Sequence, residues 1–384
     1  MRIESKLPHV GDSIFSVMAA EAQRYGAVNL SQGFPNFDPP ERLMRLVCEH
    51  IRSGANQYAP MPGLPGLRER IAAKMYDLYG LVLNPDTEIT ITAGATQALF
   101  CAFTALVRPG DEVILLEPCY DSYRPAVETV GGVAVPYALK APDFRPDWDE
   151  VAALISPHTR MIAVNTPHNP TGVLLDDADM RALERLLEGT GVALLCDEVY
   201  EHLVFDGLSH RPALCYDGLR DRTLCVYSFG KTYHNTGWKT GYCIAPPVLS
   251  AEFRKVHQFN VFCANHPVQA AFADFMDDAS AYLGLSEFYQ AKRDLFAELM
   301  RDSPLAPLPT RGSYFQLYSY GHLSDESDMD FCLRLTRECG VAAIPVSAFY
   351  SDGRDDRLIR FCFAKTEETL RDAGLRLRDI GQRR

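Results

Sequence analysis

The chain lacks the features that would place it in a membrane or against a nucleic acid. Its longest apolar stretch, residues 95–107, is interrupted by polar side chains and is shorter than the ~20 residues that a membrane span needs. No apolar core follows residues 1–6, so we expect no signal peptide. The formal net charge is −12, and an acidic surface disfavours both nucleic acid and anionic membranes.

Cysteine and metal motifs are also missing. The 11 cysteines are scattered without any Cys-x-x-Cys pair, which fits a reducing cytoplasm better than a disulfide framework. No group of His and Cys has the spacing of a zinc site, so we predict no metal. The composition, with 47% hydrophobic residues, is that of a globular protein, and 384 residues suggest two domains.

Strand and helix patterns alternate along most of the chain and predict an α/β fold. The strand at 192–197 is apolar throughout, so both of its faces should be buried in a mainly parallel sheet covered by helices. Residues 1 to about 40 form a Pro/Gly-rich entry segment, and a compact α+β unit follows residue 312. Its expected elements are strands at 313–318, 341–345 and 357–363 and helices at 330–340 and 367–382.

One stretch near the middle of the chain combines a strand, a hydroxyl and two lysines. The apolar run 224–227 predicts a buried strand that ends at Ser228, and Lys231 follows in a glycine-containing loop. A lysine in an apolar pocket has a lowered pKa, so its neutral amine can attack a carbonyl. Ser228 and Lys239 offer the hydroxyl and the cation that a phosphate requires. Taken alone, this pattern also fits a surface loop with solvated lysines.

Two other places are suited to anions. A strand at 88–92 and a helix at 97–107 enclose a small-residue turn, where free amides and the helix dipole favour a phosphate. Arg360 is a lone arginine in an apolar strand. A buried, unpaired charge is costly, so Arg360 either pairs with an internal acid or awaits a ligand carboxylate, which its planar guanidinium fits.

Together these motifs resemble the fold type I, pyridoxal-phosphate-dependent aminotransferases. The string Ser-x-x-Lys-Thr followed by Gly-Trp-Lys-x-Gly is similar to their cofactor-lysine motif, most of all in the branch of bacterial methionine aminotransferase and the kynurenine/glutamine aminotransferases. The resemblance implies a large three-layer α/β/α domain (46–285), a smaller α+β domain (286–384) and an N-terminal arm (1–45) that belongs to the small domain. It implies pyridoxal 5′-phosphate as cofactor.

The resemblance also implies a role for each matching residue. Lys231 is the catalytic lysine and general base, and Asp197, which ends the strand at 192–197, keeps the cofactor's ring nitrogen protonated so that the ring is an electron sink. The other implied cofactor contacts are Tyr58, Gly94, Ala95, Thr96, Tyr120, Asn169, Tyr200, Ser228 and Lys239. The implied substrate contacts are Gly33, Asn169 and Arg360. Glu198 and His202 are interpreted as structural.

The implied reaction moves an amino group from an apolar, aromatic or sulfur amino acid, with methionine as the expected donor, to a 2-oxo acid. Tyr58 matches a tyrosine that reaches the cofactor phosphate of the other subunit, which implies a homodimer with shared sites. Lys239 stands where many members have arginine, which favours the branch of the methionine and kynurenine enzymes. Thr96 stands where the kynurenine enzymes have a ring, which favours the methionine-type enzymes within that branch. Alternatives on the same fold are a cysteine-conjugate β-lyase, kynurenine–oxoglutarate transaminase and an acyl-CoA-dependent synthase. A pyridoxal-phosphate-binding regulator would need a basic DNA-binding domain.

Overall fold

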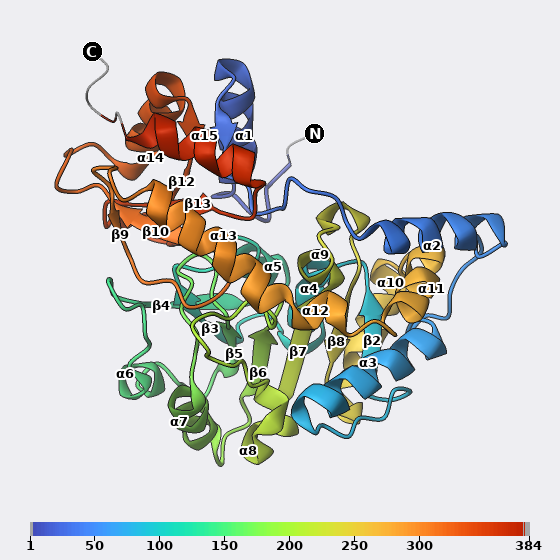
Figure 1. Ribbon diagram of the computed structural model, residues 1–384. Helices are drawn as coiled ribbons and strands as arrows, with labels where there is room; N and C mark the ends of the chain where they lie inside the picture. The colour runs from blue at the N-terminus through green and yellow to red at the C-terminus, as the bar shows by residue number, and fades with distance from the viewer. Residues whose placement is uncertain (1–2, 379, 381–384) are drawn as a thin grey trace.

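The central element of the computed structural model, which describes residues 3–378 and 380, is a seven-stranded sheet (Figure 1). Its strand order is β2-β8-β7-β6-β5-β3-β4, and β8 runs antiparallel to both of its neighbours while the other pairs are parallel. The strands are β2 (Ile89–Thr92), β3 (Glu112–Glu117), β4 (Val133–Ala138), β5 (Thr159–Asn165), β6 (Ala193–Asp197), β7 (Thr223–Ser228) and β8 (Gly241–Ile244).

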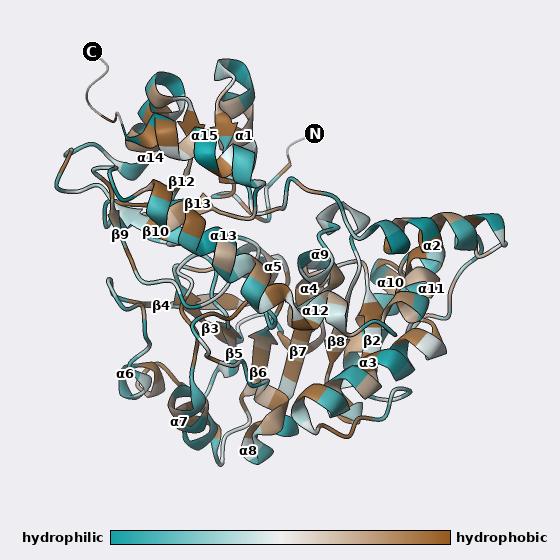
Figure 2. Cartoon of the chain, viewed as in Figure 1, coloured by the Kyte–Doolittle hydropathy of each residue, from teal (hydrophilic) through white to brown (hydrophobic). Residues whose placement is uncertain are grey.

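Alternate side chains of these strands enter two separate hydrophobic layers, as expected for a sheet buried on both faces. One layer contains Leu195 and Val226 and packs against α4 (Ala95–Leu106), α5 (Tyr123–Thr129) and α10 (Pro247–Asn260). The other contains Leu194 and Tyr227 and packs against α3 (Pro65–Tyr79), α7 (Asp177–Leu187) and α11 (His266–Phe275). Figure 2 shows the hydrophobic colour concentrated in the strands and hydrophilic colour on the outer surfaces of helices such as α3 and α7.

The C-terminal part contains an antiparallel sheet of order β12-β13-β10-β9, beside which the N-terminal helix α1 lies (Figure 1). The short strand β1 (Val28–Asn29) pairs with β11 (Val341–Ala342), so the N-terminal segment is attached to the C-terminal part. The remaining elements here are α1 (Ile14–Tyr25), α13 (Leu285–Leu299), β9 (Ala306–Pro307), β10 (Phe315–Ser319), α14 (Asp328–Arg334), β12 (Ile344–Pro345), β13 (Leu358–Cys362) and α15 (Glu367–Leu377).

The remaining helices are short or peripheral: α2 (Glu41–Arg52), α6 (Trp148–Ala152), α8 (Asp217–Arg220), α9 (Phe229–Thr232) and α12 (Ser280–Leu283). None of the helices in the described ranges combines the length and the apolar character that a membrane crossing requires.

Several elements differ from the prediction. The entry segment contains α1, which ends where Gly26 adopts a left-handed conformation (φ 59°). The single strand expected at 341–345 is two strands in different sheets, because β11 pairs with β1 whereas β12, on the other side of Ala343, pairs with β13. Strand β8 has only four residues and was not predicted. The last helix ends at Leu377, and its predicted extension through 379 and 381–382 lies outside the described residues.

Candidate active site

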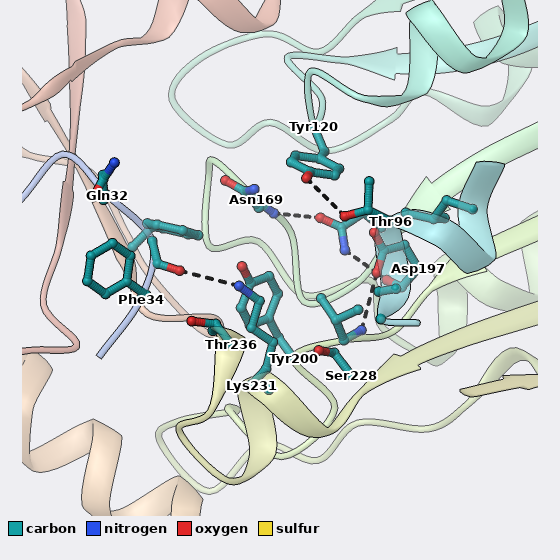
Figure 3. Close-up of a pocket in the computed structure, with 18 of the residues that line it drawn as sticks. Gln32, Phe34, Thr96, Tyr120, Asn169, Asp197, Tyr200, Ser228, Lys231 and Thr236 are labelled. Atoms are coloured by element: carbon teal, nitrogen blue, oxygen red, sulfur yellow. Dashed lines mark hydrogen bonds between the residues drawn. The ribbon is translucent and has the colours of Figure 1, made fainter. Parts of the chain in front are cut away.

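The carboxyl ends of β5, β6 and β7 border a cavity of about 260 Å³ that also touches the N-terminal segment and the C-terminal sheet (Figure 3). Every residue for which the sequence predicts a site role lines this cavity except Tyr58. These residues are Gly33, Gly94, Ala95, Thr96, Tyr120, Asn169, Asp197, Tyr200, Ser228, Lys231, Lys239 and Arg360. The fold therefore brings together residues from seven separate stretches of the chain.

Lys231 lies in α9, a single helical turn directly after β7, rather than in the expected loop. Its Nζ donates hydrogen bonds to the hydroxyl of Tyr314 at 2.9 Å and to the carbonyl of Gly33 at 3.3 Å. Burial lowers the pKa of the Lys231 amine to about 8, although the charge of Asp197 acts in the opposite direction. The neutral, nucleophilic form of the amine is therefore accessible near neutral pH.

Asp197 is the last residue of β6 and is buried. One carboxylate oxygen accepts a hydrogen bond from the hydroxyl of Tyr123 at 2.6 Å, and the other accepts one from the amide of Val199 at 3.3 Å. Burial raises the pKa of Asp197 to about 6, while the bond from Tyr123 opposes the rise. Within the described residues no basic side chain forms a salt bridge with this carboxylate, so it is suited to a ligand nitrogen that carries a proton.

The wall of the cavity near the start of α4 is rich in donors. Helix α4 begins after Gly94, whose φ of 85° favours glycine, and the first amides of a helix have no intrahelical acceptor. Gly241 allows β8 to approach this helix start closely, because a Cβ there would lie 2.5 Å from the carbonyl of Tyr227 and 3.1 Å from the amide of Ala95. Together with Ser228 and the ammonium of Lys239, these amides suit a phosphate.

Arg360, on β13, is fully buried, and its Cζ lies 3.9 Å from the centroid of the Phe315 ring. Its guanidinium donates to Asn169 Oδ1 at 2.7 Å and to the carbonyl of Ser31 at 3.0 Å, while its Nε has no hydrogen-bond partner. Burial lowers the pKa of Arg360 to about 10. The sequence left two partners open for Arg360, an internal acid or a ligand carboxylate. No acid of the described residues forms a salt bridge with Arg360, and this favours the ligand carboxylate.

Tyr58 is 81% exposed and packs edge-on against Phe262, with ring centroids 5.3 Å apart. It does not line the cavity of its own chain.

Comparison with known proteins agrees with this geometry. The family model described as "Aminotransferase class I and II" matches residues 25–377. The chain belongs to the aminotransferase class I and II family. It is 50% identical over 378 residues to the methionine aminotransferase of Escherichia coli, and the alignment covers 98% of both chains. It is 32% identical to the kynurenine–oxoglutarate transaminase of Dictyostelium discoideum, and that alignment covers 94% of this chain and 93% of the relative. A solved Escherichia coli structure, described as having a methionine aminotransferase function, superposes with a TM-score of 0.97 at 49% identity and covers 99% of this chain and all of that one.

The enzyme is thus a pyridoxal-phosphate-dependent aminotransferase, and the residues present fit that cofactor. The donor-rich wall at Gly94 matches a phosphate, and the buried carboxylate of Asp197, which lacks a cation of its own, matches a protonated ring nitrogen. The partnerless Nε of Arg360 is a donor that remains for a substrate.

Sequence reasoning missed several residues of the site. Asn165 ends β5 beside Asp197, donates to its backbone carbonyl at 2.8 Å and accepts from the backbone amide of Asn169 at 2.7 Å. A polar residue at a strand end was the available signal. Tyr123 and Tyr314 gave no such signal, because tyrosines next to strands are common in hydrophobic cores.

Proposed function

We propose that this aminotransferase transfers the amino group of methionine, or of a similar apolar or aromatic amino acid, to a 2-oxo acid. The observation that carries the proposal is that the amine of Lys231, the carboxylate of Asp197 and the guanidinium of Arg360 line one cavity. The name of the 50% identical relative, methionine aminotransferase, supports the choice of donor.

In this proposal Arg360 and Asn169 bind the substrate carboxylate, and the guanidinium of Arg360 is already oriented by Asn169. Bound pyridoxal phosphate supplies an electron sink for the negative charge that develops at the substrate α-carbon. Asp197 holds the proton on the ring nitrogen through its buried carboxylate. The Nζ of Lys231 takes the α-proton of the substrate and returns a proton later as general acid.

The cavity wall supports an apolar substrate side chain. Phe15, Phe34 and Tyr120 line it, while its three cationic residues, Lys231, Lys239 and Arg360, already have proposed partners. A second carboxylate, as in aspartate, would therefore find no free cation among the lining residues. We expect methionine and aromatic donors to react faster than aspartate in a panel tested against one 2-oxo acid. Release of pyruvate and ammonia from a cysteine conjugate without any acceptor would instead indicate the β-lyase.

A homodimer with shared sites and a cytoplasmic location complete the proposal. The exposed Tyr58 lies beside Phe262, and Phe259 is 86% exposed, so an apolar surface is available to a second copy of the chain. In such a dimer, Tyr58 of each copy would reach the phosphate site of the other copy. No disulfide joins the cysteines of the described residues, as in a reducing compartment. Sedimentation that finds only monomers at working concentrations would contradict the shared site.

The direct test is Lys231→Ala. We expect it to abolish transaminase turnover and the visible absorbance of the bound cofactor, because the amine that carries the cofactor is removed. The matched control is Lys255→Ala, which removes an exposed lysine of α10 that pairs with Glu252 and should leave both turnover and absorbance unchanged. Full activity of Lys231→Ala would refute the assignment.

A further inference from the structure

Two partners from distant parts of the chain hold the amine of Lys231. The hydroxyl of Tyr314 and the carbonyl of Gly33 both accept hydrogen bonds from its Nζ, at 2.9 and 3.3 Å. The Tyr314 hydroxyl itself donates to the same carbonyl at 2.5 Å. Because this hydroxyl donates its proton to Gly33, its lone pairs are available to the amine, and Tyr314 accepts from Lys231.

The carbonyl of Gly33 is fixed in place by its surroundings. A Cβ at Gly33 would lie 2.6 Å from the ring of Phe315, so only glycine lets the segment approach this closely. On either side of Gly33, the buried ammonium of Lys365 donates to the carbonyl of Gln32 at 3.3 Å and to that of Phe34 at 2.7 Å. The acceptor pair formed by Tyr314 and Gly33 is therefore preorganised.

The position of the two acceptors then determines the direction of the lone pair. The hydroxyl of Tyr314 and the carbonyl of Gly33 are hydrogen-bonded to each other, so both lie on the same side of Nζ, and the neutral amine donates its N–H to that side. The lone pair of Nζ is left pointing away from Tyr314 and Gly33. The flexible four-carbon stem of lysine would otherwise permit many orientations of this lone pair.

We propose that Tyr314 is a positioning residue that, with the Gly33 carbonyl, holds the free amine of Lys231 so that its lone pair is aligned for the α-proton of the substrate. The proton moves from the substrate α-carbon to Nζ and later leaves Nζ, while Tyr314 keeps its own proton throughout. This inference rests on the proposed role of Lys231.

The test compares Tyr314→Phe with Tyr289→Phe in the cofactor-loaded enzyme. Both changes remove one buried hydroxyl and keep the ring; the hydroxyl of Tyr289 contacts His234 at 3.0 Å instead of Lys231. We expect Tyr314→Phe to slow the half-reaction with an amino donor roughly 10- to 100-fold, with little change in KM, because the lone pair is misaligned. The isotope effect with an α-deuterated donor should rise, since proton transfer becomes more rate-limiting.

A second measurement does not depend on turnover. In the form that has accepted the amino group, Lys231 is free, and its pKa can be read from the pH dependence of its labelling by an amine reagent, detected by mass spectrometry. Loss of the Tyr314 acceptor should lower this pKa, because the ammonium form loses a hydrogen bond. Other charged and titratable groups also act on Lys231, namely Asp197, Lys239, Arg360 and Cys362. All four are unchanged in the variant.

The outcomes separate this inference from the proposed function. A Tyr314→Phe enzyme within about twofold of wild type, with the same isotope effect and labelling pKa, would overturn the inference. Equal losses in Tyr289→Phe would also overturn it, because they would indicate a general packing effect. If Lys231→Ala remains active, the proposed function itself fails. Thermal unfolding of each variant confirms that it is folded.

Discussion

The end of β6 and the turn after it contain three buried carboxylates, and two of them, Asp197 and Glu201, have opposite electrostatic settings. Burial raises the pKa of Asp197 to about 6, and no cation forms a salt bridge with it among the described residues. Burial also acts to raise the pKa of Glu201, but the ammonium of Lys74, at 2.5 Å, lowers it to about 2. The two carboxylates are four residues apart, yet Glu201 has its cation within the protein and Asp197 faces the cavity.

This difference separates a structural acid from a functional one. The Glu201 site is complete without any ligand, since the hydroxyls of Tyr79 and Tyr242 also lie within hydrogen-bond distance, at 3.2 and 3.3 Å. Asp197 is incomplete until a ligand provides the positive charge that its surroundings lack. A buried acid that has a raised pKa and lines a cavity therefore indicates a binding site. A buried acid that already has a cationic partner within the protein indicates a structural role, in which loss of the partner destabilises the fold.

Breaking the complete pair should have the largest effect, and that effect should be on stability. Lys74→Met leaves Glu201 buried without its cation, so we expect the free energy of unfolding to fall by about 3–5 kcal/mol in urea titrations. The matched control is Lys255→Met, which removes an exposed pair with Glu252 and should cost less than about 1 kcal/mol. A loss no larger than in the control would show that the Lys74–Glu201 pair is not structural.

Changing the incomplete site should affect activity instead. Asp197→Asn keeps the shape and can still accept from Tyr123, but it removes the negative charge, so turnover should fall roughly 10²- to 10³-fold. Steady-state kinetics on folded protein measures this loss, and Glu201→Gln serves as the comparison, with activity per folded molecule largely retained. If both variants lose activity equally, the distinction between the two acids is wrong.

The smallest effect is a difference in pH dependence, measured by urea unfolding of cofactor-free protein. The folded-state pKa of Asp197 lies above its ordinary value of 3.8, so its contribution to stability is complete below pH 3.8 and is lost as the pH rises towards 6. The folded-state pKa of Glu201 lies below 4.5, so its contribution is complete above pH 4.5 and is lost as the pH falls towards 2.

Relative to wild type, Asp197→Asn should therefore gain stability as the pH rises through about 4 to 6. The deficit of Glu201→Gln should shrink as the pH falls below about 4.5. Parallel pH profiles for the two variants would contradict the opposite directions in which the two pKa values are displaced.

Much of the fold could be predicted because its signals are local. The apolar runs that became β6 and β7 and the helical spacing of α7 and α11 depend on a few neighbouring residues. The shorter elements could not be predicted in this way. The four residues of β8 form a strand only because β2 and β7 lie on either side, and the two strands flanking Ala343 are separated by partners from opposite ends of the chain.

For the site, the sequence by itself determined the chemistry: a lysine after a strand, an acid at a strand end, a small-residue turn before a helix, and one arginine in an apolar strand. Each of these is a local pattern with a physical meaning. Only the tertiary structure decided how each group is tuned. Whether a buried acid has a cation depends on α3, more than 100 residues earlier in the chain, and the orientation of Lys231 depends on Gly33 and Tyr314. Hydrogen bonds and burial are set by groups that meet only in the folded chain, and no local pattern records them.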